Sequence, residues 1–165
     1  MSLRVLGIDP GFDRCGFGVV DMRGSEGAWI HHSCLQTKST DTFEYRLQQL
    51  RDAVSAVINE FKPHGVAIEQ LFFSNNAKTA IKVGMARGVI FLAVADLKMP
   101  IVELTPNQVK QGLAGWGGAD KKQMQSMVAR FLKLKEVPKP DDAADALAIA
   151  LVGGLLLPGM MRLKR

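Results

Sequence analysis

The sequence predicts an α/β fold in which helices flank one mixed sheet of five strands. The first forty residues contain three strand-like runs joined by short turns, a pattern typical of an antiparallel meander. Two further short apolar runs are separated by long helical patterns, so these two strands can lie parallel in the same sheet. The length of 165 residues is that of one domain.

The N-terminal elements follow from short apolar runs and the turn residues between them. Pro10 and Gly11 break the first run, and a turn-rich segment at 23–27 separates the second from the third. Residues 41–62 carry apolar side chains at helical spacing, which predicts an amphipathic helix with Thr40 or Asp41 as its N-cap. The three strands are expected at Leu3–Ile8, Gly16–Met22 and Ala28–Gln36.

The C-terminal elements alternate between buried strands and helices. Thr105 and Pro106 have the residue types of an N-cap and a first helical position, so a short helix is expected there. We expect a single domain over residues 1–158 and a basic, mobile tail over residues 159–165. The other elements are expected at Gly65–Glu69 (strand), Asn75–Lys98 (helix), Ile101–Leu104 (strand), Asp120–Leu134 (helix) and Asp141 to about Leu156 (helix).

The composition excludes several classes of protein. Hydrophobic residues make up 47% of the chain and charged residues 22%, which excludes a disordered chain. Cys15 and Cys34 form no CxxC pair, which excludes a disulfide scaffold and a cysteine zinc site and favours the reducing cytoplasm. The longest apolar stretch, Ala146–Pro158, is interrupted by glycines and is too short to span a bilayer, so no membrane association is expected.

The charge of the chain is unevenly distributed. The net charge is +5, with 7 basic and 9 acidic residues up to Asn75 and 14 basic and 7 acidic residues after it. A basic excess in one half of a chain is expected for a face that binds a polyanion such as a nucleic acid. A solvated basic surface without a partner is the alternative, and charge alone does not decide between the two.

Four carboxylates lie at positions typical of functional residues: two at the ends of predicted strands and two on the last predicted helix. Asp9 and Glu69 each end a short apolar run, so both are expected at the carboxyl edge of the sheet, where open α/β sheets bind ligands. Asp142 and Asp145 are three residues apart and share one face of the last helix. Asp141 lies on another face and is interpreted as the N-cap of that helix. The alternatives are a turn role for Asp9 and helix N-terminal chemistry for the aspartates.

Carboxylates this close repel one another and lose hydration, and a bound divalent cation removes both penalties. All-oxygen ligation is what Mg²⁺ and Mn²⁺ prefer. Two such ions about 4 Å apart can activate a water and stabilise the leaving oxygen of a phosphodiester. An anionic metal pocket within a basic surface therefore points to a nuclease.

Several segments of the chain resemble the RuvC-type Holliday-junction resolvases. The resemblance is carried by 6–11 (LGIDPG), 67–70 (AIEQ), 85–88 (MARG), 108–111 (QVKQ) and 142–148 (DAADALA), in this order and spacing. It implies an RNase H-like fold, a homodimer, and an endonuclease that uses Mg²⁺ or Mn²⁺, with two ions per active site. It also implies symmetric paired nicks in four-way DNA junctions during recombination and repair, with 5′-phosphate and 3′-hydroxyl ends. The family works with the RuvA–RuvB branch-migration complex.

The same resemblance assigns roles to individual residues. It makes Asp9, Glu69, Asp142 and Asp145 the catalytic metal ligands, although some members have His where Asp142 stands, which leaves open direct ligation or proton handling. It also gives DNA roles to the aromatic ring of Phe72, which can stack on an unpaired base, and to two lysines near the glycine-rich segment at 112–118. The residues expected to contact DNA are Phe72, Lys110, Lys121, Arg87, Lys78 and Lys82.

The remaining side chains are interpreted as structural. His31, His32 and His64 have no metal-ligand spacing, and Trp29 and Trp116 are expected to pack, with DNA contact as the alternative for Trp116. Gly84 and Gly88 within one helix indicate a close backbone neighbour, either the sheet or the same helix of a second copy.

Two other functions compete with the nuclease. The first is a non-catalytic junction-binding module. The four carboxylates argue against it, because without bound metal they would repel DNA. The second is an actin- or Hsp70-like nucleotide-binding fragment, which needs two such domains, more than 165 residues supply.

Overall fold

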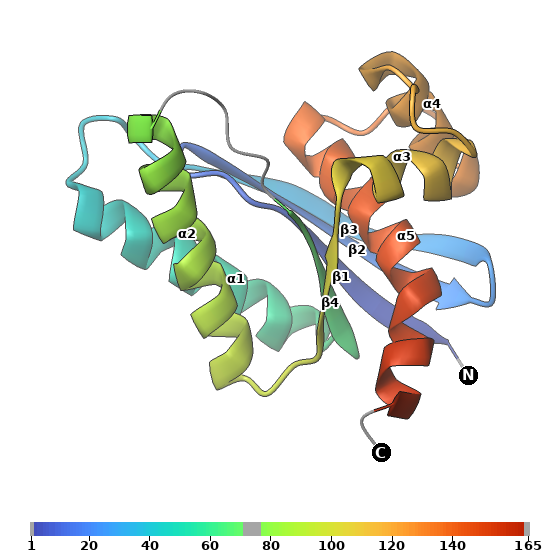
Figure 1. Ribbon diagram of the computed structural model, residues 1–165, viewed down its shortest axis with the longest axis horizontal. Helices are drawn as coiled ribbons and strands as arrows, with labels where there is room; N and C mark the ends of the chain where they lie inside the picture. Colours follow the sequence, from blue (N-terminus) through green and yellow to red (C-terminus); the bar gives the residue numbers. More distant parts are fainter. Residues whose placement is uncertain (1, 71–76, 164–165) are drawn as a thin grey trace.

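The chain forms five strands and five helices over the residues described by the structure, a computed structural model that covers residues 2–70 and 77–163 (Figure 1). In chain order the elements are β1 (Leu3–Asp9), β2 (Arg14–Arg23), β3 (Glu26–Gln36), α1 (Phe43–Phe61), β4 (Gly65–Glu69), α2 (Ala77–Asp96), β5 (Ile101–Leu104), α3 (Pro106–Ala114), α4 (Lys121–Phe131) and α5 (Asp141–Leu163).

The strands form one mixed sheet in the order β3-β2-β1-β4-β5. β1 pairs antiparallel with β2, and β2 pairs antiparallel with β3, which confirms the predicted meander. β4 lies parallel to both β1 and β5, as expected for strands joined through helices. The register pairs Ile8 with Ile68, so the next residues, Asp9 and Glu69, end neighbouring strands at the same edge.

Helices cover both faces of the sheet. α1 and α2 lie on one side, and α5 with α3 and α4 lies on the other (Figure 1). Alternate residues of β1 and β4 belong to the two cores: Leu6 and Ile68 pack in the α1/α2 core, whereas Val5 and Ala67 pack in the α5 core. Asp9 and Glu69 share the alternation of Val5 and Ala67, so their side chains belong to the α5 face.

Glycines allow α5 to lie directly on β1 and β2. A Cβ atom at Gly7 would stand 2.1 Å from the main-chain oxygen of Ala146, and one at Gly16 would stand 2.0 Å from that of Asp142. No side chain fits at these two positions while the helix keeps its place. Gly16 is paired with Asp9 across β1 and β2, so the close approach brings the first turn of α5 to the carboxyl edge of the sheet.

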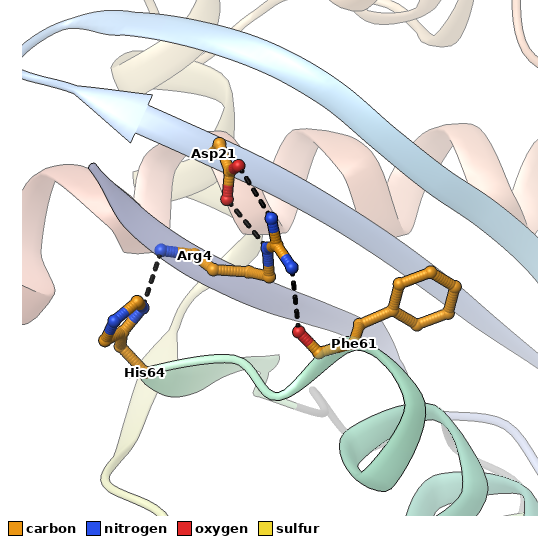
Figure 2. A network of polar contacts seen from close by, with 4 residues as sticks. All are labelled: Arg4, Asp21, Phe61 and His64. Carbon is orange, nitrogen blue, oxygen red and sulfur yellow. Dashed lines mark hydrogen bonds and ion pairs between the residues drawn. The ribbon is translucent and has the colours of Figure 1, made fainter.

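A polar network fixes the other end of the sheet (Figure 2). The Arg4 guanidinium donates to both carboxylate oxygens of Asp21 at 2.8 and 2.9 Å and to the main-chain oxygen of Phe61 at 3.1 Å. The main-chain N–H of Arg4 donates to Nδ1 of His64 at 2.9 Å. The network ties β1 to β2, to the end of α1 and to the start of β4, and the arginine lowers the pKa of the Asp21 carboxyl. His64 is thus structural, as predicted.

The other predicted structural side chains give a mixed result. His31 stacks on Phe61 with ring centroids 4.6 Å apart, and Nδ1 of His32 accepts a hydrogen bond from Trp29. The two tryptophans, which are expected to pack, do so only in part: Trp29 lies beside His32 and is 44% exposed, and Trp116 is 55% exposed. The glycine-rich segment provides no apolar cover for Trp116, whose ring lies along Gly118.

Two helix starts differ from the prediction. The N-cap of α1 is Thr42, whose hydroxyl accepts a hydrogen bond from the N–H of Tyr45, rather than Thr40 or Asp41. Asp141 is the first residue of α5 rather than its cap, and its carboxylate pairs with Lys121 at 3.1 Å. The N–H groups of Ala143 and Ala144 instead donate to the main-chain oxygen of Pro140.

The last helix is longer than predicted. α5 continues past Leu156, through Pro158, to Leu163, so residues 159–163 are helical where a mobile tail was expected. Leu157 is fully buried and holds this part of the helix in the core despite the proline, which removes one backbone hydrogen bond. With this length, α5 is long and apolar enough to span a membrane, whereas the stretch Ala146–Pro158 alone was expected to be too short. Most of its apolar residues are buried in the fold, as in the core helix of a globular protein.

Candidate active site

Asp9 and Glu69 are brought together at the carboxyl edge by the parallel pairing of β1 with β4. Each side chain is only partly accessible, because α5 covers this face of the sheet. Burial, followed by the negative charges of Glu69, Asp145 and Asp142, raises the pKa of Asp9 from 3.8 to about 7. Burial, followed by Asp145, raises the pKa of Glu69 from 4.5 to about 7. These two carboxylates therefore form one electrostatic unit with the aspartates of α5.

Asp142 lies in the first turn of α5 and Asp145 lies three residues further along the helix, and both reach the same edge, as their spacing predicts. Asp142 pairs with the Arg14 guanidinium at 2.7 Å, and Asp145 lies 3.7 Å from the Lys121 ammonium. Burial raises the pKa of Asp145, and Lys121 opposes this shift. The structure thus collects all four predicted carboxylates from β1, β4 and α5 in one place.

The donor set fits a hard divalent cation. Four carboxylates supply oxygen ligands, which Mg²⁺ and Mn²⁺ prefer, and burial makes their mutual repulsion costly unless a cation compensates it. Within residues 2–70 and 77–163, no three Asp, Glu, His or Cys side chains are already gathered in metal-ligand geometry. Two of the four carboxylates pair with cations: Asp142 with Arg14, and Asp145 with Lys121.

The two lysines predicted near the glycine-rich segment do lie beside the carboxylates. Lys110 from α3 and Lys121 from α4 line a cavity of about 220 Å³ together with Glu69 and Asp145. Each lysine partly opposes the rise in pKa of one carboxyl of the cluster: Lys110 acts on Glu69, and Lys121 acts on Asp9. An anionic site with cations on its rim can bind metal and phosphate together.

Sequence reasoning missed Arg14 and Lys139. Together with Lys121 they line a second hollow, of about 660 Å³, that also contains Asp141 and Asp142. The pairing of β1 with β2 indicates the position of Arg14. Gly16 pairs with Asp9, and Arg14 comes two residues before Gly16, so it lies just beyond the end of β1. Lys139 precedes α5 and gave no comparable signal.

The other residues expected to contact DNA fall into two groups. Arg87 is largely buried on the α1/α2 side, where it binds the main chain of Glu69 and the carboxylate of Glu103 instead of facing solvent. Lys82 is exposed on α2. Phe72 and the side chain of Lys78 lie outside the described residues.

A hollow larger than the two described above is not the candidate site. It has a volume of about 820 Å³ and lies between the β2–β3 hairpin and the end of α4, where Trp29 and Phe131 line it. It contains Asp21, which Arg4 neutralises, but none of the four carboxylates of the cluster. The candidate site follows from the chemistry of the side chains rather than from the size of the hollow.

Comparison with known proteins places this arrangement in a family. A family model described as crossover junction endodeoxyribonuclease RuvC matches residues 5–153. A protein of that name from Natranaerobius thermophilus is 47% identical over 147 residues, which are 89% of this chain and 91% of that protein. One from Thermotoga maritima is 47% identical over 149 residues, 90% of this chain and 89% of that protein.

Solved structures agree with the fold. The structure of Thermus thermophilus RuvC matches with a TM-score of 0.87 and 36% identity, covering 96% of this chain and 97% of that chain. T. thermophilus RuvC in complex with Holliday junction substrate also matches with a TM-score of 0.87, at 34% identity, covering 95% and 96%. The yeast mitochondrial Holliday junction resolvase Ydc2, at 15% identity and a TM-score of 0.71, shares the fold. The predicted RNase H-like α/β resolvase fold is confirmed.

Proposed function

The chain belongs to the RuvC family of crossover junction endodeoxyribonucleases, and from this premise we propose that it resolves four-way DNA junctions by paired symmetric nicks. The observation that supports this most is the convergence of Asp9, Glu69, Asp142 and Asp145 from three separate elements within a rim of cations. The likeness to a relative solved with Holliday junction substrate supports the choice of DNA.

Nucleases of the RuvC family depend on divalent metal, and the four carboxylates are the residues that would hold it here. We propose Mg²⁺ or Mn²⁺, with two ions per site. Asp9 would hold metal together with the other three carboxylates, whose negative charges all act on its carboxyl. When bound, such ions supply an activated water and stabilise the leaving oxygen. Hydrolysis then forms a bond from water oxygen to phosphorus and breaks the bond to the 3′ oxygen, which takes a proton.

The cations on the rim hold the DNA and balance charge. Lys121, now shared between Asp141 and Asp145, is free to turn toward a phosphate once the carboxylates bind metal. Arg14 would do the same from Asp142, and Lys110 would face the phosphate from α3. These three side chains orient the scissile phosphate and offset its negative charge near the carboxylates.

We further propose that the protein acts as a homodimer through α2. Ile81 is 64% exposed, Leu92 59% and Met85 49%, which is unusual for large apolar side chains on one helix. Among the described residues outside the helix's own backbone, no atom lies within 4 Å of a Cβ placed at Gly84 or Gly88, so the described part of the sheet is not the close neighbour that these glycines suggested. A second copy packed on this face would pair two active sites for two nicks.

The family likeness also supports the RuvA–RuvB complex as a partner. The free cysteines support a cytoplasmic location.

The test compares cleavage of a synthetic mobile four-way junction with a linear duplex of the same sequence, in Mg²⁺, Mn²⁺ or EDTA. Metal-dependent paired nicks in the junction alone are the expected result. Asp9→Asn should reduce cleavage at least about 100-fold, because the most buried ligand is lost, while junction binding in EDTA is retained. Asp52→Asn, an exposed carboxylate paired with Arg51 on α1, is the matched control.

Two outcomes would overturn the proposal. Tight junction binding without cleavage in either metal would support a junction-binding module. Wild-type cutting by Asp9→Asn would show that the carboxylate cluster is not the catalytic centre.

A further inference from the structure

Arg87 makes three contacts on the face of the sheet opposite the carboxylates. Its Nη1 donates to the main-chain oxygen of Glu69 at 2.6 Å, and its Nη2 pairs with the carboxylate of Glu103. Its guanidinium carbon lies 4.7 Å from the centre of the Phe91 ring. The Arg87 side chain is 18% exposed, so most of it is withdrawn from solvent. The contacts to Glu69 and Glu103 join α2 to the ends of β4 and β5, whereas Phe91 lies on α2 itself.

The backbone at Glu69 lies where the sheet ladder ends. Glu69 pairs with Leu104, the last residue of β5, and the N–H of Gln70 donates to the oxygen of Leu104 at 2.7 Å. The next residue, Thr105, leaves the sheet because it caps α3. The hydrogen bond from Arg87 is therefore an additional restraint on the peptide that carries Glu69, supplied from outside the sheet.

This peptide needs a restraint because its side chain sits in a repulsive cluster. The Glu69 carboxylate, on the α5 face, is repelled by Asp145 and faces Asp9. At a strand end, repulsion of this kind favours fraying, which would carry the side chain away from its neighbours. Residues behind a metal ligand commonly fix its direction, and their loss weakens metal binding.

We propose that Arg87, held by Glu103, is a positioning residue that fixes the carboxyl end of β4 and thereby aims Glu69 at the metal site. The inference rests on the proposed function, since it assigns Glu69 as a metal ligand. Arginine suits this place because its planar fork donates in two directions at once, which a lysine ammonium cannot do with the same geometry. Glu103 neutralises the guanidinium, so Arg87 acts through the geometry of the Glu69 peptide rather than as a free cation facing DNA.

The experiment separates positioning from DNA contact. Arg87→Lys keeps the charge but not the fork, and Glu103→Ala removes the residue that holds the fork. Mn²⁺ affinity is measured from the EPR signal of free Mn²⁺ without DNA, and junction affinity is measured in EDTA. Both variants should bind Mn²⁺ about tenfold more weakly, with junction affinity in EDTA within about twofold of wild type. Glu103→Gln, which keeps an acceptor for Arg87, should restore most of the Mn²⁺ affinity.

The controls keep each failure distinct. Arg51→Lys, at an exposed ion pair on α1, should leave both affinities unchanged. Circular dichroism verifies that each variant is folded at the temperature of the binding measurement. Unchanged Mn²⁺ affinity in folded Arg87→Lys and Glu103→Ala overturns the inference, and so does a loss of junction affinity in EDTA alone, which would make Arg87 a DNA contact. If Asp9→Asn binds Mn²⁺ as tightly as wild type, the proposed metal site itself is wrong.

Discussion

At the scale of single residues, the acidic cluster lowers the stability of the folded protein when its carboxyl groups are ionised. Asp9 and Glu69 ionise near pH 7 because they are buried beside other carboxylates. In the unfolded chain the same groups ionise near pH 4. Between these values the folded protein binds more protons than the unfolded chain, so this cluster makes stability fall as the pH rises from about 4 to about 7.

We therefore predict that Asp9→Asn is more stable than wild type in EDTA at pH 8. The expected gain in free energy of unfolding is about 2 kcal/mol, because the substitution removes a charge that is poorly hydrated when buried and is repelled by its neighbours. This is less than the full shift implies, because the site is partly open to solvent. The gap should narrow as the pH is lowered toward 4, as followed by urea unfolding at several pH values.

Comparing two proteins at each pH isolates this effect from other titrations. His32 acts in the opposite direction, because burial lowers its pKa and stability is lost as it is protonated. This contribution is common to wild type and Asp9→Asn and cancels in the difference. A gap that stays constant between pH 4 and pH 8 would contradict the assignment of the raised pKa to Asp9.

At the scale of elements, the site depends on how closely α5 approaches the sheet. The main-chain oxygen of Asp142 lies where a side chain on Gly16 would be, so the glycine sets the height of the first turn of α5 above β2. Because Asp142 lies in that turn and Asp145 lies three residues further along the same helix, packing and site geometry are coupled.

Gly16→Ala should therefore lower both stability and metal-dependent cleavage. The new methyl group would stand 2.0 Å from a backbone oxygen, which cannot move without displacing the helix. The expected loss in free energy of unfolding is about 1–3 kcal/mol, as for other overpacked cores. Chemical denaturation and the junction-cleavage assay measure the two effects.

Gly159→Ala is the matched control on the same helix. In the part of the chain that the structure describes, leaving out the helix's own backbone, no atom lies within 4 Å of a Cβ added at Gly159, so alanine should stabilise the helix by about 0.5–1 kcal/mol and leave cleavage unchanged. Equal destabilisation by both substitutions would show that the close approach at Gly16 is not the cause.

At the scale of the whole molecule, the open apolar face of α2 predicts the assembly. Met85→Glu places a charge between Ile81 and Leu92 on the exposed apolar face of α2. This substitution should weaken self-association at least about tenfold. Sedimentation velocity over a concentration series measures the shift from dimer to monomer, and paired nicks should give way to single nicks.

The control for this substitution lies on the neighbouring helix. Tyr45 is 52% exposed on α1, and Tyr45→Glu should leave sedimentation and paired nicking unchanged. A Met85→Glu protein that remains dimeric, or a wild type that is monomeric at all concentrations, would contradict the role of this face.

Much of the site was determined by the sequence itself. Apolar runs that end in Asp9 and Glu69 define strands and place both carboxylates at strand ends, because buried strands are short and continuous in hydrophobicity. The spacing of Asp142 and Asp145 places them on one helix face whatever the helix packs against. These features depend on local periodicity, which a single sequence displays.

Contacts between distant segments were decided by the tertiary structure alone. The direction of Arg87 depends on where β5 ends beside β4, and the position of Arg14 depends on the register of β2 against β1. The length of α5 depends on the burial of Leu157, which overrides the local tendency of Pro158 to end a helix. A proline inside a helix costs about 3 kcal/mol, whereas each large apolar side chain that α5 buries, such as Leu151 or Leu157, contributes about 1.5–3 kcal/mol. Where the two disagree, packing prevails.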